Sequence, residues 1–234
     1  MNILIPMAGA GSRFEQAGYT FPKPLIEIHG KPMIQKVVEN LNLDGRFIFL
    51  VQKEHYEDYA FQYLLPLLSP GCEIVQVDGL TEGSASTTLL AKQFINNDAP
   101  LITANADQFI EFLNDDWVDK FDADGGMLTF NATHPKWSFA KVGEDNYVTE
   151  VAEKKPISDV ATVGVYHWAK GSDYVKYAEQ MIEKDVRVNN EFYICPVFNE
   201  AIKDGKKIKS VPIKKMWGLG TPEDLRYYLT NYKK

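Results

Sequence analysis

The chain has 234 residues, of which 45% are hydrophobic and 12% aromatic, and this composition excludes a disordered polypeptide. The formal net charge is −7, so the chain lacks the excess of basic residues that is typical of proteins that bind duplex nucleic acid. The two cysteines, Cys72 and Cys195, lie far apart, which argues against a zinc site or a disulfide framework. No stretch approaches the ~20 apolar residues of a membrane span. We therefore expect a cytoplasmic protein with no nucleic-acid or membrane partner.

Strands and helices alternate in the first half of the chain. Short apolar runs predict the strands, and apolar side chains at helical spacing predict the helices between them. In chain order, the expected elements are strand 2–6, helix 32–41, strand 47–51, helix 56–65, strand 73–77, helix 84–95 and strand 101–103. This alternation predicts a mostly parallel sheet that is covered by helices.

The pattern changes after about residue 125. Strands are expected at 127–130, 139–142, 148–151 and 162–168, separated by short polar turns that favour antiparallel pairing, and a helix at 172–182. Near the end, Thr221-Pro222-Glu223-Asp224 combines the residues of a helix start, with Thr at the N-cap and Pro in the first turn. Because no linker or repeat divides the chain, we expect a single domain over residues 1–234.

A glycine-rich turn, Met7-Ala8-Gly9-Ala10-Gly11-Ser12-Arg13, follows the first strand. Glycines let backbone N–H groups approach phosphate oxygens closely. The turn is neither a dinucleotide fingerprint, because Phe14 stands at the third glycine position, nor a P-loop. Arg13 and Lys23, the latter held between two prolines, supply cations for a compact anion. The pattern predicts a phosphate site; the alternative is a connecting turn with two solvated cations.

Ala8-Gly9-Ala10-Gly11-Ser12-Arg13-Phe14, with Pro22-Lys23-Pro24-Leu25 and Gly30-Lys31-Pro32-Met33-Ile34, resembles the signature of the sugar-phosphate nucleotidylyltransferases. The resemblance covers almost the whole chain and implies an α/β fold of the Rossmann-like GT-A type. In such a fold a mixed, mostly parallel central sheet is flanked by helices, beside a smaller, partly antiparallel acceptor-binding portion. It also divides the single domain into a nucleotide-binding half, about 1–120, and an acceptor-binding half, about 121–234.

The same resemblance assigns roles on the nucleotide side. It implies that the loop holds the base and phosphates of a nucleoside triphosphate through Met7, Ala8, Gly9, Ala10, Gly11 and Ser12. Arg13 would meet the departing pyrophosphate, and Lys23 the α-phosphate under attack. Gly83-Ser84-Ala85 matches the segment beside the nucleobase, and Gln76 is a second candidate for the base edge. By physical chemistry alone, Gly83 and Ser84 are an equally good helix start with a serine cap.

Asp107 follows a short buried strand, at the edge of a parallel sheet where ligands bind. Mg²⁺ typically uses one or two carboxylates together with phosphates and water. The resemblance implies that Asp107 holds Mg²⁺; the alternative is a solvated loop aspartate. The family's second metal-binding aspartate is replaced here by Gly218. Three explanations stay open: Asp107 and phosphates suffice, Glu191 or another carboxylate compensates, or catalysis is impaired.

On the acceptor side, the segment 150–156 resembles the family's Glu-Lys-Pro motif. It implies that Glu153 touches the acceptor and that Lys154 or Lys155 binds its phosphate. Gly164 matches a glycine close to the acceptor, and Glu191 lies in a further acceptor-side segment. Without the resemblance, the two lysines would predict a solvated turn.

Together with the resemblance, these features predict an enzyme that transfers a nucleoside monophosphate from a triphosphate to a phosphorylated acceptor, with Mg²⁺ and release of pyrophosphate. We expect a sugar phosphate as the acceptor; the resemblance also leaves phosphocholine-like or polyol phosphates open, which short relatives use. Because the chain ends soon after the Gly-Thr-Pro helix, we expect a pyrimidine nucleotide, CTP before UTP, and a role in surface-glycan or capsule precursors. A homodimer is compatible with these features. The alternatives are a GT-A glycosyltransferase, for which Asp122-Ala123-Asp124 spells the D-x-D motif, and a catalytically silent nucleotide sensor.

Overall fold

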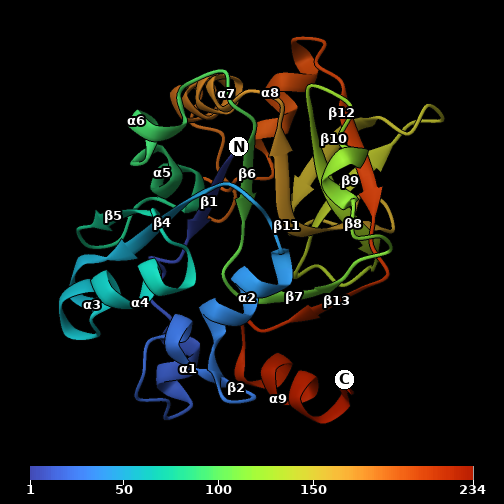
Figure 1. Cartoon of the computed structure of the whole chain (residues 1–234). Helices are drawn as coiled ribbons and strands as arrows, with labels where there is room; N and C mark the ends of the chain where they lie inside the picture. The colour runs from blue at the N-terminus through green and yellow to red at the C-terminus, as the bar shows by residue number, and fades with distance from the viewer. Residues whose placement is uncertain (234) are drawn as a thin grey trace.

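The computed structural model describes residues 1–233 and is built around one nine-stranded mixed sheet (Figure 1). Its main path is β10-β9-β11-β6-β1-β4-β5, and β8 pairs with both β11 and β12. The parallel part consists of β1 (Asn2–Pro6), β4 (Arg46–Gln52), β5 (Glu73–Val77) and β6 (Leu101–Ala104). The other strands are β8 (Gly125–Asn131), β9 (Ser138–Val142), β10 (Val148–Glu153), β11 (Val160–Trp168) and β12 (Ile208–Pro212). The predicted mixed sheet with an antiparallel portion is confirmed.

Helices cover both faces of this sheet. Side chains of β1 alternate between two hydrophobic cores, since Leu4 belongs to one and Ile3 and Ile5 to the other. The core around Leu4 packs under α5 (Ser84–Leu89), α6 (Lys92–Ile95), α7 (Gly171–Glu183) and α8 (Val197–Lys203). The core around Ile3 and Ile5 packs under α2 (Met33–Leu41), α3 (Lys53–Asp58) and α4 (Phe61–Leu68). The central strands are thus buried on both faces, as their continuous apolar runs require.

A third, smaller core lies below the carboxyl ends of β1 and β6 (Figure 1). Its buried members include Phe14 and Met33 from the start of the chain and Trp217 and Tyr228 from its end. The elements here are α1 (Ser12–Gln16), η1 (Lys23–Leu25), β2 (Glu27–Ile28), β3 (Lys31–Pro32), β7 (Gln108–Glu111), β13 (Lys215–Gly218) and α9 (Pro222–Asn231), and η2 (Trp117–Lys120) follows β7 in the chain. This packing brings residues 12–33 and the C-terminal segment 215–231 together at one edge of the sheet.

Several elements differ from the sequence prediction. The helix expected at 56–65 is two helices, because Ala60 adopts a positive φ of 54° between α3 and α4. The helix expected at 84–95 divides likewise into α5 and α6. Pro32 precedes α2 as its N-cap instead of lying in its first turn. The predicted start of α9 is confirmed, since Thr221 Oγ1 accepts a hydrogen bond from the Asp224 backbone N–H at 3.1 Å.

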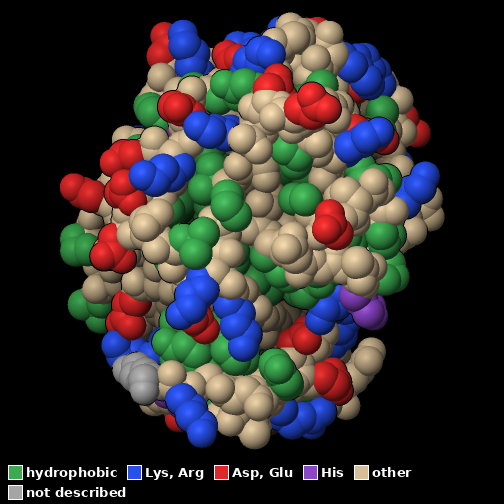
Figure 2. All heavy atoms as spheres, turned by 90° about the vertical axis from the view of Figure 1, so that its right-hand side faces the viewer, with side chains coloured by type: hydrophobic (Ala, Val, Ile, Leu, Met, Phe, Trp, Pro, Cys, Tyr) green, Lys and Arg blue, Asp and Glu red, His purple; other side chains and the backbone are tan. Residues whose placement is uncertain are grey.

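No helix within residues 1–233 is both long enough and apolar enough to cross a membrane. Figure 2 shows acidic and basic side chains interspersed on the face that carries the antiparallel strands.

Candidate active site

A cavity of about 590 Å³, here called the central cavity, opens at the carboxyl ends of β1 and β6. It has one wall from the loop after β1 and the start of α5, and another from β10, β11 and the segment before α8. Residues predicted from both halves of the chain meet in it. These are Met7, Ala8, Gly9, Ala10, Arg13, Lys23, Gly83, Ser84, Asp107, Glu153, Gly164 and Glu191.

The remaining predicted residues do not line this cavity. Gly11 and Ser12 lie where α1 begins, and Gly11 has a positive φ of 66° that suits glycine. Gln76 is exposed on β5, the edge strand of the sheet. Lys154 and Lys155 are both exposed beyond β10, but the Lys154 ammonium lies over the ring of Tyr193, which does line the cavity. Of the two lysines, the structure therefore brings Lys154 to the site.

Lys23 and Asp107 form an ion pair inside the central cavity. Lys23 Nζ lies 2.9 Å from Asp107 Oδ2, and about a quarter of each side chain is exposed, 24% and 26%. Pro22 is extended, with φ −60° and ψ 150°, and Lys23 opens η1, so the prolines set the direction of the lysine. Asp107 is held through its backbone, because its carbonyl accepts a hydrogen bond from Leu219 N–H at 2.8 Å. A cation and a carboxylate thus face the same space from two separate segments.

Gly83 joins the two walls of the cavity. Its φ of 126° belongs to glycine, and a Cβ there would lie 2.5 Å from Phe192 O and 2.6 Å from Phe192 N. Two hydrogen bonds flank this contact, from Ala85 N–H to Phe192 O at 2.9 Å and from Phe192 N–H to Glu82 O at 2.8 Å. The predicted serine cap is wrong, because Gly83 is the N-cap and no side chain caps α5. The Phe192 carbonyl instead accepts a hydrogen bond from the Ala85 N–H, which the first turn of a helix leaves without a partner inside the helix.

Gly83→Ala is expected to lower the free energy of unfolding by about 2–4 kcal/mol and to weaken triphosphate binding, because the new methyl group strikes backbone atoms that cannot move aside. Chemical denaturation and calorimetric titration with nucleoside triphosphates measure the two effects. Gly205→Ala is the matched control, since Gly205 also has a positive φ of 78° but open space around it. Its cost is expected to be about 1–2 kcal/mol. Equal losses in both variants would contradict a special role for the Gly83 contact.

Two carboxylates lie against the glycine turn at residues 218–220. A Cβ at Gly220 would lie 2.6 Å from Asp107 Oδ2. A Cβ at Gly218 would lie 3.4 Å from both Cγ and Oδ2 of Asp224, in the first turn of α9. Asp224 Oδ1 in turn lies 2.9 Å from Lys136 Nζ. The carboxylate next to Gly218 is therefore that of Asp224, from the helix that follows the turn, and not that of Glu191.

The D-x-D sequence lies far from these carboxylates. Gly125, directly after it, pairs with Trp168, and Trp168 pairs with Leu101 at the amino end of β6. Asp107 follows the carboxyl end of β6, so the two sites lie at opposite edges of the sheet. Asp124 is also paired with Lys206 at 3.1 Å, and Asp122 with Lys209. This placement does not support a glycosyltransferase metal site at Asp122-Ala123-Asp124.

The cavity wall formed by β10, β11 and the segment before α8 is acidic, since it carries Glu153 and Glu191. Glu153 accepts a hydrogen bond from Ser138 Oγ, and burial raises the pKa of its carboxyl. Ser138 and Lys154 oppose this increase in the pKa, whereas the nearby Glu191 adds to it. Burial and Glu191 likewise raise the pKa of Tyr193, while Arg13 lowers it. Arg13, which follows the glycine turn, thus lies close enough to Tyr193 to act on the pKa of its hydroxyl.

Gly164 makes room for two amide side chains in the same wall. Its φ is 76°, and β11 loses its regular register between Thr162 and Tyr166. A Cβ at Gly164 would lie 2.1 Å from Asn105 Nδ2 and 3.1 Å from Gln108 Oε1. Gln108 is 2% exposed, and both polar atoms of its side chain lack a hydrogen-bond partner among the described residues. Buried amides are rarely left unpaired, so Gln108 marks a place for a polar ligand group or water.

The profile of the nucleotidyl transferase family matches residues 3–234, which is nearly the whole chain. The chain belongs to the nucleotidyl transferase family.

Individual relatives agree with this assignment. The chain is 28% identical to the low-salt glycan biosynthesis nucleotidyltransferase Agl11 of Haloferax volcanii, over 96% of this chain and 64% of that protein. It is 23% identical to the bifunctional protein GlmU of Methanocaldococcus jannaschii, over 96% of this chain and 52% of that protein. The chain thus spans between about half and two thirds of the length of these curated relatives.

Solved structures show the same fold. The nucleoside-diphosphate-sugar pyrophosphorylase of Vibrio cholerae superimposes with a TM-score of 0.85 at 28% identity, covering 98% of this chain and all of that one. A UDP-glucose pyrophosphorylase complexed with UDP-glucose superimposes with a TM-score of 0.78, over 99% of this chain and 97% of that one, at 19% identity. The second likeness is informative about the fold alone.

This member of the nucleotidyl transferase family has site residues that the sequence did not single out. Trp137 precedes β9 and lines the central cavity, as do Lys136, Gln108 and Asp224. Tyr193 belongs to the predicted acceptor segment but had no assigned role. For Trp137 a signal was present, because a tryptophan in a polar turn has no local reason to be there.

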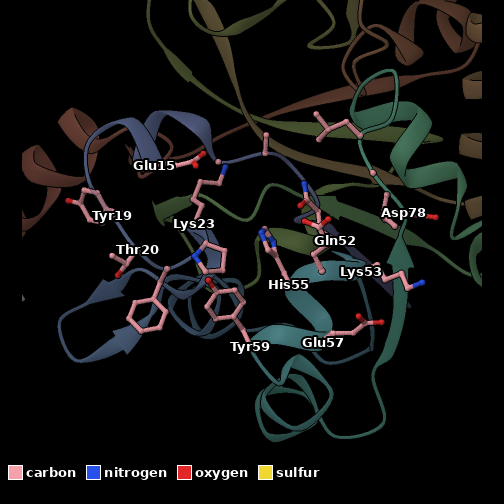
Figure 3. Close-up of a pocket in the computed structure, with 18 residues that line it drawn as sticks. Glu15, Tyr19, Thr20, Lys23, Gln52, Lys53, His55, Glu57, Tyr59 and Asp78 are labelled. Carbon is pink, nitrogen blue, oxygen red and sulfur yellow. The ribbon is translucent and has the colours of Figure 1, made fainter.

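A second cavity of about 720 Å³, here called the side cavity, adjoins the central one. Figure 3 shows Lys23 between Glu15 and Tyr19 on one side and Gln52 and His55 on the other. Ala10, Lys23 and Leu80 line both cavities, so they form the boundary between them. Burial lowers the pKa of His55, which favours the neutral imidazole near neutral pH.

Proposed function

We propose that this protein transfers a nucleoside monophosphate from a nucleoside triphosphate to a phosphorylated acceptor and releases pyrophosphate. The observation that carries the proposal is the central cavity, where the glycine loop and Arg13 face the acceptor wall around Glu153, with the Lys23–Asp107 pair between them. A sugar phosphate as acceptor and a role in surface-glycan precursors are supported by two relatives, a glycan biosynthesis nucleotidyltransferase and a nucleoside-diphosphate-sugar pyrophosphorylase. For the triphosphate, we propose CTP before UTP.

The reaction needs positioning and charge stabilisation more than proton transfer. An oxygen of the acceptor phosphate attacks the α-phosphorus in line, and the bond to the pyrophosphate oxygen breaks. The attacking oxygen is anionic at neutral pH, so no general base is required. Arg13 and Lys23 stabilise the negative charge of the triphosphate from within the cavity, at positions that are set before the substrate arrives.

The carboxylates of the site fit Mg²⁺ that is also bound to phosphate. Within residues 1–233 no group of three or more His, Cys, Asp or Glu side chains could hold a metal ion by itself. Asp107 and Asp224 nevertheless lie against the same glycine turn, and Mg²⁺ needs only one or two carboxylates when phosphates supply the rest. We propose that Asp107 holds Mg²⁺ and that Asp224 supplies the second carboxylate at Gly218. Bound there, the ion would neutralise charge on the triphosphate.

The test is pyrophosphate release with Mg²⁺ across a matrix of CTP, UTP, dTTP, ATP and GTP against sugar 1-phosphates and other phosphorylated acceptors. Release that depends on one triphosphate and one acceptor is expected. Triphosphate binding without release for any acceptor would favour the silent sensor. Release of a nucleoside diphosphate from a nucleotide-sugar would favour the glycosyltransferase.

A further inference from the structure

The acceptor end of the central cavity carries two carboxylates that no cation neutralises directly. Glu153 and Glu191 both line the cavity, and the hydrogen bond from Ser138 Oγ is neutral. Within residues 1–233, neither carboxylate forms an ion pair with lysine or arginine, and nearby Arg187 is engaged by Glu82 and Asp185, at 2.5 Å each. Two like charges in a partly buried site favour a ligand of opposite charge.

The cations nearby are already committed to other groups. Lys23 pairs with Asp107 and Lys136 with Asp224, and Lys154 Nζ lies over the Tyr193 ring, 4.3 Å from its centre. Under the proposed function, Arg13 and Lys23 bind phosphates of the triphosphate, and Lys154 is the lysine nearest the acceptor phosphate. When these cations are engaged, Glu153 and Glu191 are left facing the part of the acceptor beyond its phosphate.

Two aromatic rings lie at the same end of the cavity. Trp137 is oriented by an edge-to-face contact with Phe130, with ring centres 5.4 Å apart, and its carbonyl accepts a hydrogen bond from Lys154 N–H at 3.0 Å. Tyr193 lies across from it on the segment before α8. Lysine ammonium groups lie over both rings, since Lys136 Nζ is 4.6 Å from the centre of Trp137. Aromatic faces beside carboxylates are a typical site for an organic cation.

An independent observation shows that this end of the cavity is prepared for a polar ligand. Gln108 is 98% buried, lines the cavity beside Gly164, and leaves both its carbonyl oxygen and its amide nitrogen unpartnered. Asn105, on the same turn, is exposed to the cavity and lies against the same glycine. Hydrogen bonds from a ligand to these amide groups would replace the hydrogen bonds to water that the amides lose when they are buried.

We infer that the acceptor carries an ammonium group, held between Glu153 and Glu191 against the rings of Trp137 and Tyr193. This inference rests on the proposed function, because it names the chemical class of the phosphorylated acceptor. The phosphate of the acceptor points toward Lys23 and Lys154, and the positive group toward the acidic wall. Its remaining polar atoms reach Asn105 and Gln108. A neutral sugar phosphate leaves the two carboxylates without a countercharge.

The experiment compares pairs of acceptors that match in size and differ in one positive charge. Phosphocholine is compared with 3,3-dimethylbutyl phosphate, phosphoethanolamine with 2-hydroxyethyl phosphate, and glucosamine 1-phosphate with glucose 1-phosphate. The readout is kcat/KM for pyrophosphate release. For a pair without turnover, it is the Kd of each acceptor for the protein with triphosphate bound. In the pair that binds best, the charged member is expected to be preferred by about tenfold or more.

Glu191→Gln is expected to lower kcat/KM for the charged member about tenfold more than for its neutral partner, because the substitution removes the charge of an exposed side chain and keeps its size. Glu150→Gln is the control, since Glu150 is exposed on the same strand as Glu153 and does not line the cavity. An equal or stronger use of the neutral members, an equal loss for both members in Glu191→Gln, or no binding of any acceptor would overturn the inference. Pyrophosphate release with neutral acceptors would leave the proposed function standing, whereas absence of both triphosphate binding and release would overturn the proposed function itself.

Discussion

Lys23→Met is expected to lower kcat by about 10²–10³-fold while the protein stays folded, because it removes the preorganised positive charge that the proposed function places at the reacting phosphate. Methionine keeps the length of the side chain and loses the ammonium that lies 2.9 Å from Asp107. Pyrophosphate release at saturating substrates measures kcat, and calorimetric titration measures triphosphate binding. The loss is expected mainly in kcat, since an interaction that strengthens in the transition state does not stabilise the ground state equally.

Lys31→Met is the control for this substitution. Lys31 also forms a close ion pair, with Nζ 2.7 Å from Glu39 Oε1, but it is more exposed and lies outside the central cavity. It is expected to keep nearly full activity, because exposed ion pairs contribute little. Less than a tenfold loss in Lys23→Met at saturating substrates would show that Lys23 does not act on the transition state.

Asp107→Asn is expected to lower kcat by about 10²–10³-fold and to raise the Mg²⁺ concentration for half-maximal activity, because an amide is a much weaker ligand for Mg²⁺ than a carboxylate. Pyrophosphate release across a Mg²⁺ titration measures both effects. Binding of Mn²⁺ to the complex of protein and triphosphate, followed by electron paramagnetic resonance, gives a readout that does not depend on turnover. Weaker Mn²⁺ binding in the variant is expected.

Two further variants sharpen this test. Asp224→Asn is expected to raise the Mg²⁺ requirement in the same direction, since Asp224 occupies the space beside Gly218. Asp122→Asn is the control, because Asp122 belongs to the D-x-D sequence at the opposite edge of the sheet and pairs with Lys209. A larger rise in the Mg²⁺ requirement for Asp122→Asn than for Asp107→Asn would place the metal site at the D-x-D sequence and favour the glycosyltransferase alternative.

Local patterns in the sequence determined the family, the mixed sheet and most of its strands. The strand expected at 73–77 is β5 without change, and the apolar run 47–51 lies inside β4. Such predictions succeed because strands that are buried on both faces need continuous apolar side chains, and this signal is contained within the segment itself. The helix start at Thr221 was predictable for the same reason, since its cap bond closes over three residues.

The tertiary structure decided which chemical groups meet. Gln108 pairs with Gly218 across the β7–β13 ribbon, and this pairing of segments about a hundred residues apart places the glycine turn, and with it Asp224, beside Asp107. No local pattern shows that the turn of Gly218 and Gly220 lies against Asp107, more than a hundred residues earlier in the chain. The same holds for Phe192, whose carbonyl replaces the expected serine cap of α5. Spacing along the chain singled out Arg13, Lys23 and Asp107 on their separate segments. Packing between segments decided which charged groups meet in the central cavity, because contacts between distant segments leave no signal in either segment alone.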